Sequence, residues 1–425
     1  MKVIPLIPHG LKPERFCIPF GTTQVVPCCK AVSMWIRQTL TVTGNPLSRF
    51  AAISVACLAL AGCRPHDFPQ FPANYREYAY VTNGTSGTVS IFDVVNVGLD
   101  REIAVGQNPV AVAASPTKNE IYVVNSGAAG GEGSVSVIDA GKNVVSATIP
   151  VHRQPVSIDI DHDGKLAYVA DYGSNMVSVI DVAARREIVT IGVGEKPKAV
   201  RLSPDGKTLV VANSGGNSVT VVDVTSQRVR ETLSGCPGAS DVVILPDSSK
   251  SLVSCAGGHQ VMAIALALPG RAAQPDKLEA MLDVGHAPER MALKPDGGET
   301  FVLNSLSNSV SEVYNTTDEV GATYLIGNGP ASGAVTSDNS MLYVANAHSQ
   351  YVTLYAIDDG KRAGSVHVGD GPSAMAFSKA GHLLFVVDTG TGDVAAIRTS
   401  TRSLFALLPA GRGPNAIAVK GFSVK

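Results

Sequence analysis

The sequence predicts an all-β protein, a β-propeller of four-stranded blades, with eight blades favoured and seven as the alternative. Three observations carry this prediction. A strand-like tetrad recurs eight times, the strand after each tetrad alternates in polarity, and a proline opens a further strand once per repeat. Four short strands in a period near 42 residues are the repeat of a propeller blade.

The tetrads mark the end of one strand in each repeat. A Gly- and Ser-rich turn follows them, then an alternating strand such as 177–181 (VSVID), which is the pattern of a β-hairpin. The next strand ends near Gly, as in 101–106 (REIAVG). Successive tetrads lie 42, 46, 42, 42, 49, 42 and 42 residues apart: YVTN at 80, YVVN at 122, YVAD at 168, VVAN at 210, LVSC at 252, FVLN at 301, YVAN at 343 and FVVD at 385.

The proline-led strand, as in 197–206 (PKAVRLSPDG), should be innermost in its blade. We expect the tetrad strand to be second and the strand after the VSVID-type run to be outermost. The fifth repeat departs from the series, because its Pro237 is displaced by two residues. The other repeats hold the position with Pro109, Pro155, Pro197, Pro288, Pro330, Pro372 and Pro414.

The two ends of the repeat region are complementary. The chain enters at the strand of the first tetrad and ends with 413–419 (GPNAIAV), a proline-led strand without a successor. Because unpaired edges invite aggregation, we expect the N- and C-terminal strands to pair in one blade and close the ring. With that composite blade counted once, the tetrad and proline series each have eight members, which favours eight blades.

Residues 34–62 predict a lipoprotein signal peptide. Basic residues precede a twelve-residue apolar stretch, 50–61, which is too short to span a bilayer as a mature helix. The stretch ends in LAGC, which closely resembles the lipobox of bacterial lipoproteins and implies cleavage before Cys63 and lipid attachment to it. The alternative is an ordinary signal peptide with a chance cysteine.

The remaining domain boundaries follow from composition. We interpret 1–33 as an upstream extension or a mis-assigned start, with Met34 as the true start, because this stretch has prolines and cysteines but no periodicity. Residues 63–78 are a Pro-rich tether, and 79–425 form the propeller. The predicted location is exported and lipid-anchored to the cell envelope, at the outer membrane or periplasmic face in a Gram-negative cell.

The charge distribution limits the class of partner. Residues 1–63 hold six basic residues and one acid, a net of +5, so the rest carries −7 of the total of −2. Nucleic-acid binding needs clustered Lys and Arg, and this acidic body has no basic stripe. We therefore expect an envelope protein or a small ligand as partner, and a membrane contact through the lipid anchor.

The YVTN tetrads, the VSVID strands and the SPDG turn at 203–206 resemble the YVTN-repeat β-propeller family, which includes YncE-like and surface-layer-like proteins. The resemblance covers essentially all of 79–425. It implies the propeller fold, although members of that family are mostly described as seven-bladed. It implies little about chemistry, because a fold of this kind hosts many functions.

The Asn or Asp that ends most tetrads invites two hypotheses. One is a polar ring for a ligand; the one we prefer is that each side chain bonds its own following backbone and starts the turn. The same turn role is expected of Asp93, Asp139, Asp181 and Asp223 at the ends of the next strands. The tetrad residues are Asn83, Asn125, Asp171, Asn213, Asn304, Asn346 and Asp388.

Four charged residues interrupt the small side chains of the innermost strands: Asp159, Arg201, Asp241 and Arg290. Charges near the axis need partners, so we expect ion pairs between neighbouring blades, with a polar channel site as the alternative.

The loops at the channel mouth add His259, His286 and Glu289 around the fifth and sixth blades. Together with Asp241 and Arg290 they are our candidate ligand-binding residues. Their spacing does not predict a metal site.

Two cysteines, Cys236 and Cys255, remain in the propeller. Export permits a disulfide, and alignment with the fourth repeat puts them at the Gly194 and Asn213 positions. Those positions lie near the same end of adjacent strands but about four residues out of register, so the Pro237 shift would have to curl the chain back. The sequence leaves both states open.

No catalytic set can be placed in this sequence, and no cofactor is predicted. It has no haem-attachment motif, nucleophile elbow or phosphate loop, and its one Trp, Trp35, lies in the signal peptide. The first hypothesis is therefore a membrane-anchored binding or scaffolding propeller of the cell envelope. The alternatives are a lactonase- or lyase-like periplasmic enzyme, or a redox accessory protein, with a site at the channel mouth.

Overall fold

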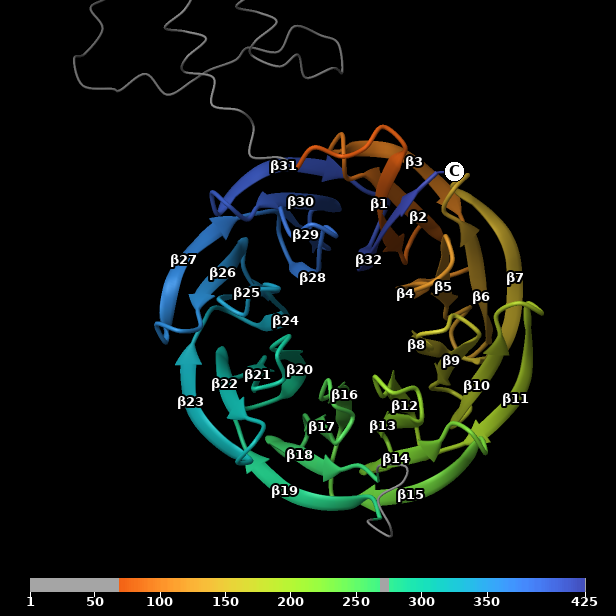
Figure 1. Cartoon of the computed structure of the whole chain (residues 1–425), viewed down its shortest axis with the longest axis vertical. Helices are drawn as coiled ribbons and strands as arrows, with labels where there is room; N and C mark the ends of the chain where they lie inside the picture. Colours follow the sequence, from red (N-terminus) through yellow and green to blue (C-terminus); the bar gives the residue numbers. More distant parts are fainter. Residues whose placement is uncertain (1–68, 268–274, 425) are drawn as a thin grey trace, which may run out of the picture. The chain divides into compact units, whose positions relative to one another are not determined.

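The computed structural model describes residues 69–267 and 275–424, and within them the chain forms eight four-stranded antiparallel sheets arranged in a ring (Figure 1). The lipid-attachment prediction for Cys63 and the signal peptide fall outside these residues. In the described part of the chain, no helix is long and apolar enough to span a bilayer. The prediction of an eight-bladed propeller is confirmed.

Blades 1 to 4 take up the first half of the ring. Blade 1 joins β1 (Tyr75–Asn83), β2 (Thr88–Asp93) and β3 (Gly98–Ala104) to the last strand, β32 (Pro414–Ser423). Blades 2, 3 and 4 are β4 (Pro109–Ala114), β5 (Glu120–Asn125), β6 (Glu132–Asp139), β7 (Val144–Arg153); β8 (Pro155–Ile160), β9 (Leu166–Asp171), β10 (Met176–Asp181), β11 (Arg186–Gly192); and β12 (Pro197–Leu202), β13 (Thr208–Asn213), β14 (Ser218–Asp223), β15 (Arg228–Ser234).

Blades 5 to 8 repeat the same order, from the innermost to the outermost strand. They are β16 (Ala239–Ile244), β17 (Lys250–Cys255), β18 (Gln260–Ala265), β19 (Lys277–Asp283); β20 (Pro288–Leu293), β21 (Glu299–Asn304), β22 (Ser309–Tyr314), β23 (Glu319–Leu325); β24 (Pro330–Val335), β25 (Met341–Asn346), β26 (Tyr351–Ala356), β27 (Lys361–His367); and β28 (Pro372–Phe377), β29 (Leu383–Asp388), β30 (Asp393–Arg398), β31 (Ser403–Pro409).

Pairing of β1 with β32 closes the ring, as the sequence predicts. The antiparallel register runs from Tyr75 opposite Ser423 to Asn83 opposite Pro414. Beyond the strands, Val424 and Asn74 exchange two more hydrogen bonds, of 2.8 and 3.0 Å. The ring therefore has no unpaired inner edge at the junction of its ends.

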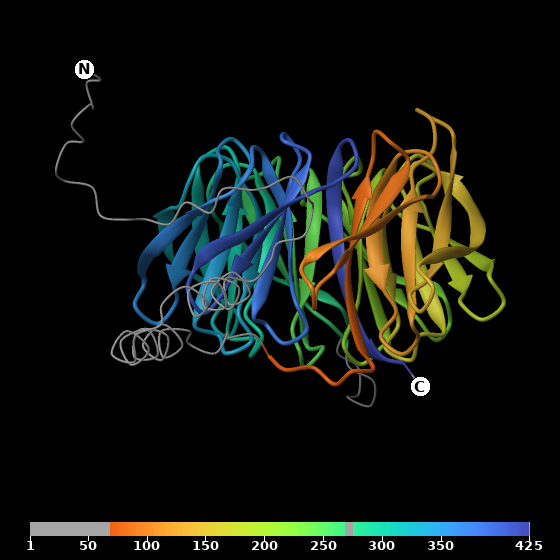
Figure 2. The same ribbon diagram turned by 90° about the horizontal axis from the view of Figure 1, so that it is seen from above.

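The ring has two faces, which are distinguished by the turns they carry. The terminal face carries the turns between first and second strands, such as 203–207, and β1 begins and β32 ends there. The loop face carries the hairpins between second and third strands, such as 84–87, and the crossovers from one blade to the next, such as 105–108. In the side view, both ends of the described chain lie on the lower side, which is the terminal face (Figure 2).

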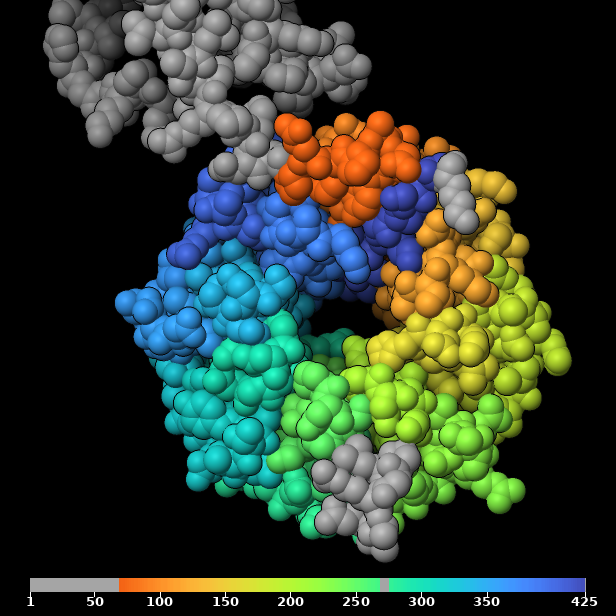
Figure 3. Space-filling view, in the orientation of Figure 1, coloured from red at the N-terminus to blue at the C-terminus, as the bar shows by residue number. Residues whose placement is uncertain are grey.

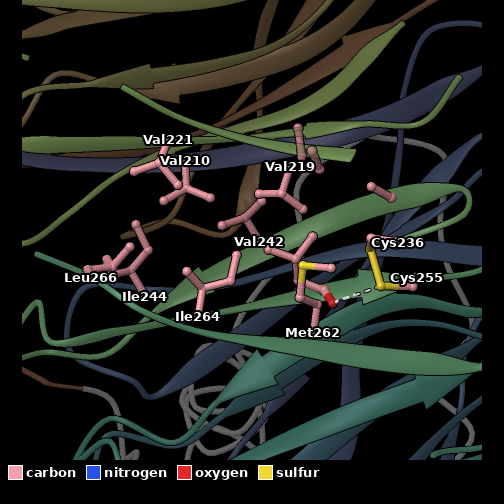
Figure 4. Packing of buried hydrophobic residues seen from close by; sticks show 14 residues of the cluster. Val210, Val219, Val221, Cys236, Val242, Ile244, Cys255, Met262, Ile264 and Leu266 are labelled. Atoms are coloured by element: carbon pink, nitrogen blue, oxygen red, sulfur yellow. Dashed lines mark hydrogen bonds between the residues drawn. A yellow bond between two sulfur atoms is a disulfide. The ribbon is translucent and has the colours of Figure 1, made fainter. Parts of the chain in front are cut away.

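The core is divided among the seams between neighbouring blades, because the second and third strands are buried on both sides. Each Val or Ile buried in this way contributes about 1.5 to 3 kcal/mol. The seam between blades 4 and 5 shows the pattern (Figure 4), with Val210, Val219, Val221, Val242, Ile244, Met262, Ile264 and Leu266 packed together.

The role predicted for the Asn that ends five of the tetrads is wrong. These side chains are buried, and they bond neighbouring strands rather than their own following turn. Asn125 accepts a hydrogen bond from the Gly106 amide at 3.1 Å and donates to the hydroxyls of Ser134 and Ser136 at 3.1 and 2.9 Å. By contrast, Asp181 accepts from the Ala183 and Ala184 amides, at 2.9 and 2.8 Å, as predicted for the strand-end aspartates.

Two tetrads end in Asp, which cannot donate to the hydroxyl ladder when ionised. Burial raises the pKa of Asp171 to about 7, and the Ser178 hydroxyl offsets part of this by donating to it at 2.7 Å. Burial also raises the pKa of Asp388, and the carboxyl group of Asp393, opposite it on β30, adds to the rise.

Cys236 and Cys255 form a disulfide, with their Cα atoms 4.8 Å apart (Figure 4). The repeat alignment predicts that these two positions are out of register, and this prediction is wrong. A Gly packs against the tetrad Asn 19 residues later in other blades, since a Cβ on Gly106 or Gly194 would lie 2.6 Å from Asn125 or Asn213. The disulfide has the same sequence separation of 19, so it replaces the Gly–Asn contact of the other blades.

Candidate binding face

The five residues predicted for the channel mouth come from blades 5 and 6. Asp241 lies on β16, and Glu289 and Arg290 lie on β20, both innermost strands. His259 lies in the hairpin between β17 and β18, and His286 lies in the crossover that precedes β20. The space-filling view shows the channel as an opening at the centre of the ring (Figure 3).

Asp241 holds the two inner strands together. Its side chain is 7% exposed and lies 3.7 Å from the Arg290 guanidinium, and its second oxygen accepts the Met291 amide at 3.0 Å. Ser240 strengthens the same junction by donating to the Glu289 carbonyl at 3.2 Å. The predicted ion pair therefore forms here, and Asp241 has a structural role between the blades.

The second predicted ion pair, between Asp159 and Arg201, does not form in the described structure. Asp159 accepts hydrogen bonds from the Leu202 amide of the next inner strand, at 2.8 Å, and from the amide of Ile160, the next residue in the chain, at 3.0 Å. A backbone donor thus satisfies the carboxylate, because the inner strands are close enough for a side chain to bridge them. Arg201 stays exposed toward solvent.

His259 and His286 are brought together on the loop face. Their ring centroids are 4.3 Å apart, with the planes inclined by 33°, and both side chains are exposed. The His259 Nδ1 accepts the Ala287 amide at 3.4 Å, which fixes one ring beside the crossover. In the described ranges, no group of three or more His, Cys, Asp or Glu side chains is arranged to hold a metal ion.

Three large apolar side chains on the same face were not predicted from the sequence. Leu306, in the hairpin between β21 and β22, is 73% exposed, and its amide donates to the His286 carbonyl at 3.2 Å. Leu325 ends β23 and is 84% exposed, and Tyr351 begins β26 and is 45% exposed, with its ring 5.0 Å from that of His367. All three lie at the loop-face ends of blades 6 and 7.

Comparison of equivalent positions in the repeats could have identified two of these residues, Leu306 and Leu325, from the sequence. Leu306 stands in a hairpin series that otherwise contains no Leu, Val or Ile. Leu325 occupies the position of Asp283 and His367 in neighbouring blades, 42 residues away on either side. We call His259, His286, Leu306, Leu325 and Tyr351 the loop-face patch. It marks where blades 5 to 7 depart from the shared repeat.

One protein-family model matches part of the chain. The model of the family described as lactonase, 7-bladed β-propeller, matches residues 78–190. That range lies in blades 1 to 3, so the loop-face patch is outside it. No curated protein sequence matches the chain.

Solved structures share the fold. Hydrazine synthase of Kuenenia stuttgartiensis is 26% identical, with 65% of this chain and 91% of that chain covered and a TM-score of 0.54. Dihydro-heme d1 dehydrogenase NirN is 15% identical, with coverage of 85% and 78% and a TM-score of 0.64. Apo AztD from Citrobacter koseri is 13% identical, with coverage of 83% and 99% and a TM-score of 0.59. The chain is thus a β-propeller whose relatives by fold include enzymes.

Proposed function

We propose that this protein is an exported, lipid-anchored propeller of the cell envelope that binds a partner protein through its loop-face patch, without catalysing a reaction. The observation that carries the proposal is the grouping of Leu306, Leu325 and Tyr351 on the loop-face ends of blades 6 and 7. Large apolar side chains exposed on one face mark interaction sites, and aromatic residues are enriched at protein interfaces.

The position of the termini supports an outward-facing patch. The described chain begins at Pro69 on the terminal face, where the Phe71 ring stacks on Tyr75 at 4.8 Å and lies 5.7 Å from His382. Residues 63 to 69 can span at most about 20 Å. A lipid on Cys63 would therefore hold the terminal face toward the membrane and leave the loop face for a partner.

The polar groups near the patch are suited to binding. Asp241, the most buried carboxylate of the mouth, is committed to Arg290 and to the Met291 amide. The Arg290 side chain remains 54% exposed, and His286, whose ring lies against that of His259, is four residues upstream of it. A partner with an apolar centre and an acidic rim would complement this surface.

The experiment compares partner retention by the tagged full-length protein and its single variants. Leu306→Ser, Leu325→Ser and Tyr351→Ser should each weaken binding of the same co-purifying protein by about tenfold or more, because apolar anchors dominate interfaces. Tyr314→Ser is the matched control, since Tyr314 is exposed on the terminal face of blade 6. Equal retention by all four variants would contradict the proposal.

A lactone-hydrolysing enzyme is the second candidate, favoured by the family match over 78–190. Turnover of a lactone panel by the purified protein, lost in Arg290→Gln but unchanged in Tyr314→Ser, would favour this alternative over pure binding.

A further inference from the structure

The terminal face carries a cleft between blades 7 and 8, on the opposite face of the ring from the loop-face patch. Its volume is about 600 Å³, within the range of small-molecule sites. Turn 336–340 of blade 7 and turns 378–381 and 399–402 of blade 8 line it. The Tyr343 and Phe377 rings, which also line it, meet edge to face with centroids 5.8 Å apart.

The equivalent seam between blades 2 and 3 is closed by a carboxylate. Glu120 begins β5, and Arg185 of the next blade reaches it with both Nη atoms, one of them at 3.2 Å. The Tyr122 hydroxyl donates to the same carboxylate at 2.7 Å and accepts from Arg185 at 3.1 Å. The seam is therefore a built-in example of carboxylate recognition by an arginine and a tyrosine.

Arg402 is the counterpart of Arg185 in blade 8. Each follows the end of its third strand, Asp181 or Arg398, by four residues, and each has a positive φ, 56° and 52°. Tyr343 is the counterpart of Tyr122, but Met341 stands where Glu120 would. Within the described residues, Arg402 makes no hydrogen bond or ion pair, so the seam has the arginine and tyrosine without the acid.

The other charges of the cleft leave it open to an anion. Lys379 adds a second exposed cation. The one acid of the lining, Asp338, turns one oxygen into its own loop, where the Thr336 hydroxyl and the Ser340 amide and hydroxyl donate to it. Met341 and Phe377 supply apolar wall beside these groups.

We propose that this cleft binds a small organic carboxylate with an apolar body, held by Arg402 and the Tyr343 hydroxyl as Glu120 is held in the equivalent seam. Two donors converging on one carboxylate give charge-assisted hydrogen bonds, which are roughly twice as strong as neutral ones. The apolar body packs against Phe377 and Met341. This site is independent of the loop-face patch.

The first test titrates the purified full-length protein with 3-phenylpropanoate, with 3-phenylpropanamide as the neutral analogue. We expect the carboxylate to bind and the amide to bind about tenfold more weakly or not at all. Arg402→Gln, an exposed substitution, should weaken carboxylate binding by about tenfold or more. No binding of the carboxylate up to about 10 mM, or equal binding by Arg402→Gln, would overturn the proposal.

The second test supplies the missing acid from the chain itself. Met341→Glu should pair with Arg402 as Glu120 pairs with Arg185 and so abolish binding of 3-phenylpropanoate, whereas the isosteric Met341→Gln should retain it. Met341→Glu should also have a higher Tm than Met341→Gln, because only the carboxylate can form the ion pair. Equal binding by the two variants, or a lower Tm for Met341→Glu, contradicts the assigned geometry.

Discussion

Asp171 makes the stability of the propeller depend on pH in a direction that the structure fixes. Its side chain is fully buried, and burial raises its pKa from 3.8 to about 7. Between these values the folded state keeps a proton that the unfolded state releases. The contribution of Asp171 to the free energy of unfolding is therefore most favourable at low pH, and it falls as pH rises from about 4 to about 7.

Replacing Asp171 by Asn removes this dependence. The equivalent residues Asn83, Asn125 and Asn213 donate hydrogen bonds to hydroxyl groups on the third strand of their blades. An Asn at position 171 could donate in the same way to the Ser178 hydroxyl, which lies beside it. From pH 5 to the folded pKa near 7, about two units at 1.36 kcal/mol each give roughly 3 kcal/mol. The advantage of Asp171→Asn in free energy of unfolding should grow by about that much between pH 5 and pH 8.

The assay is urea unfolding at pH 5 and pH 8, followed by circular dichroism because the propeller contains no Trp. Asp223→Asn is the matched control. Hydrogen bonds from Ser226 lower the pKa of Asp223, so its carboxylate is ionised in both states throughout this range and its effect should not change with pH. An advantage of Asp171→Asn that is constant or shrinks from pH 5 to pH 8 would refute the reasoning.

Three further predictions concern the covalent and terminal restraints. Cys236→Ala with Cys255→Ala should lower the free energy of unfolding by about 3 kcal/mol, and reductant should bring the wild type to the same urea midpoint; a midpoint unaffected by either change would contradict this. Deleting 414–425 removes β32, so the protein should lose its cooperative thermal transition, and an unchanged Tm would argue against closure by this strand. Cys63→Ala should abolish incorporation of radiolabelled palmitate, and equal labelling would disprove lipid attachment there.

The ring and its closure could be predicted because each blade repeats the same short-range pattern. Tetrads, turn residues and prolines recur at one period, and the incomplete repeats at 80 and 414 complete each other. Strand order within a blade follows from the same period, since consecutive strands pair by hairpins.

The role of the tetrad Asn was mispredicted, and the state of Cys236 and Cys255 was left open. Both depend on contacts between different strands or with the crossover, which alignment along one strand does not reveal. Ser or Thr at five and seven residues after Asn83, Asn213 and Asn304 is the signal for the hydroxyl ladder. The recurring separation of 19 residues between Gly and the tetrad Asn is the signal for Cys236 and Cys255.

The candidate sites were predicted only in part. The pairing of His259 with His286 and of Asp241 with Arg290 follows from their adjacent blades. The exposure of Leu325 and the unpaired state of Arg402 depend on what the neighbouring blade lacks, because a seam is satisfied by residues from two repeats. Such absences become visible only when equivalent seams are compared in three dimensions.

The most direct test of the proposed function is site-specific photo-crosslinking in cells that produce the full-length protein. A photoreactive residue at position 306, on the loop face, should form one discrete adduct with a partner protein, and Leu325→Ser should reduce that adduct. The same probe at position 314, on the opposite face of blade 6, should not form it. An adduct from position 314 alone, or one from position 306 that Leu325→Ser leaves unchanged, would contradict binding through the loop-face patch.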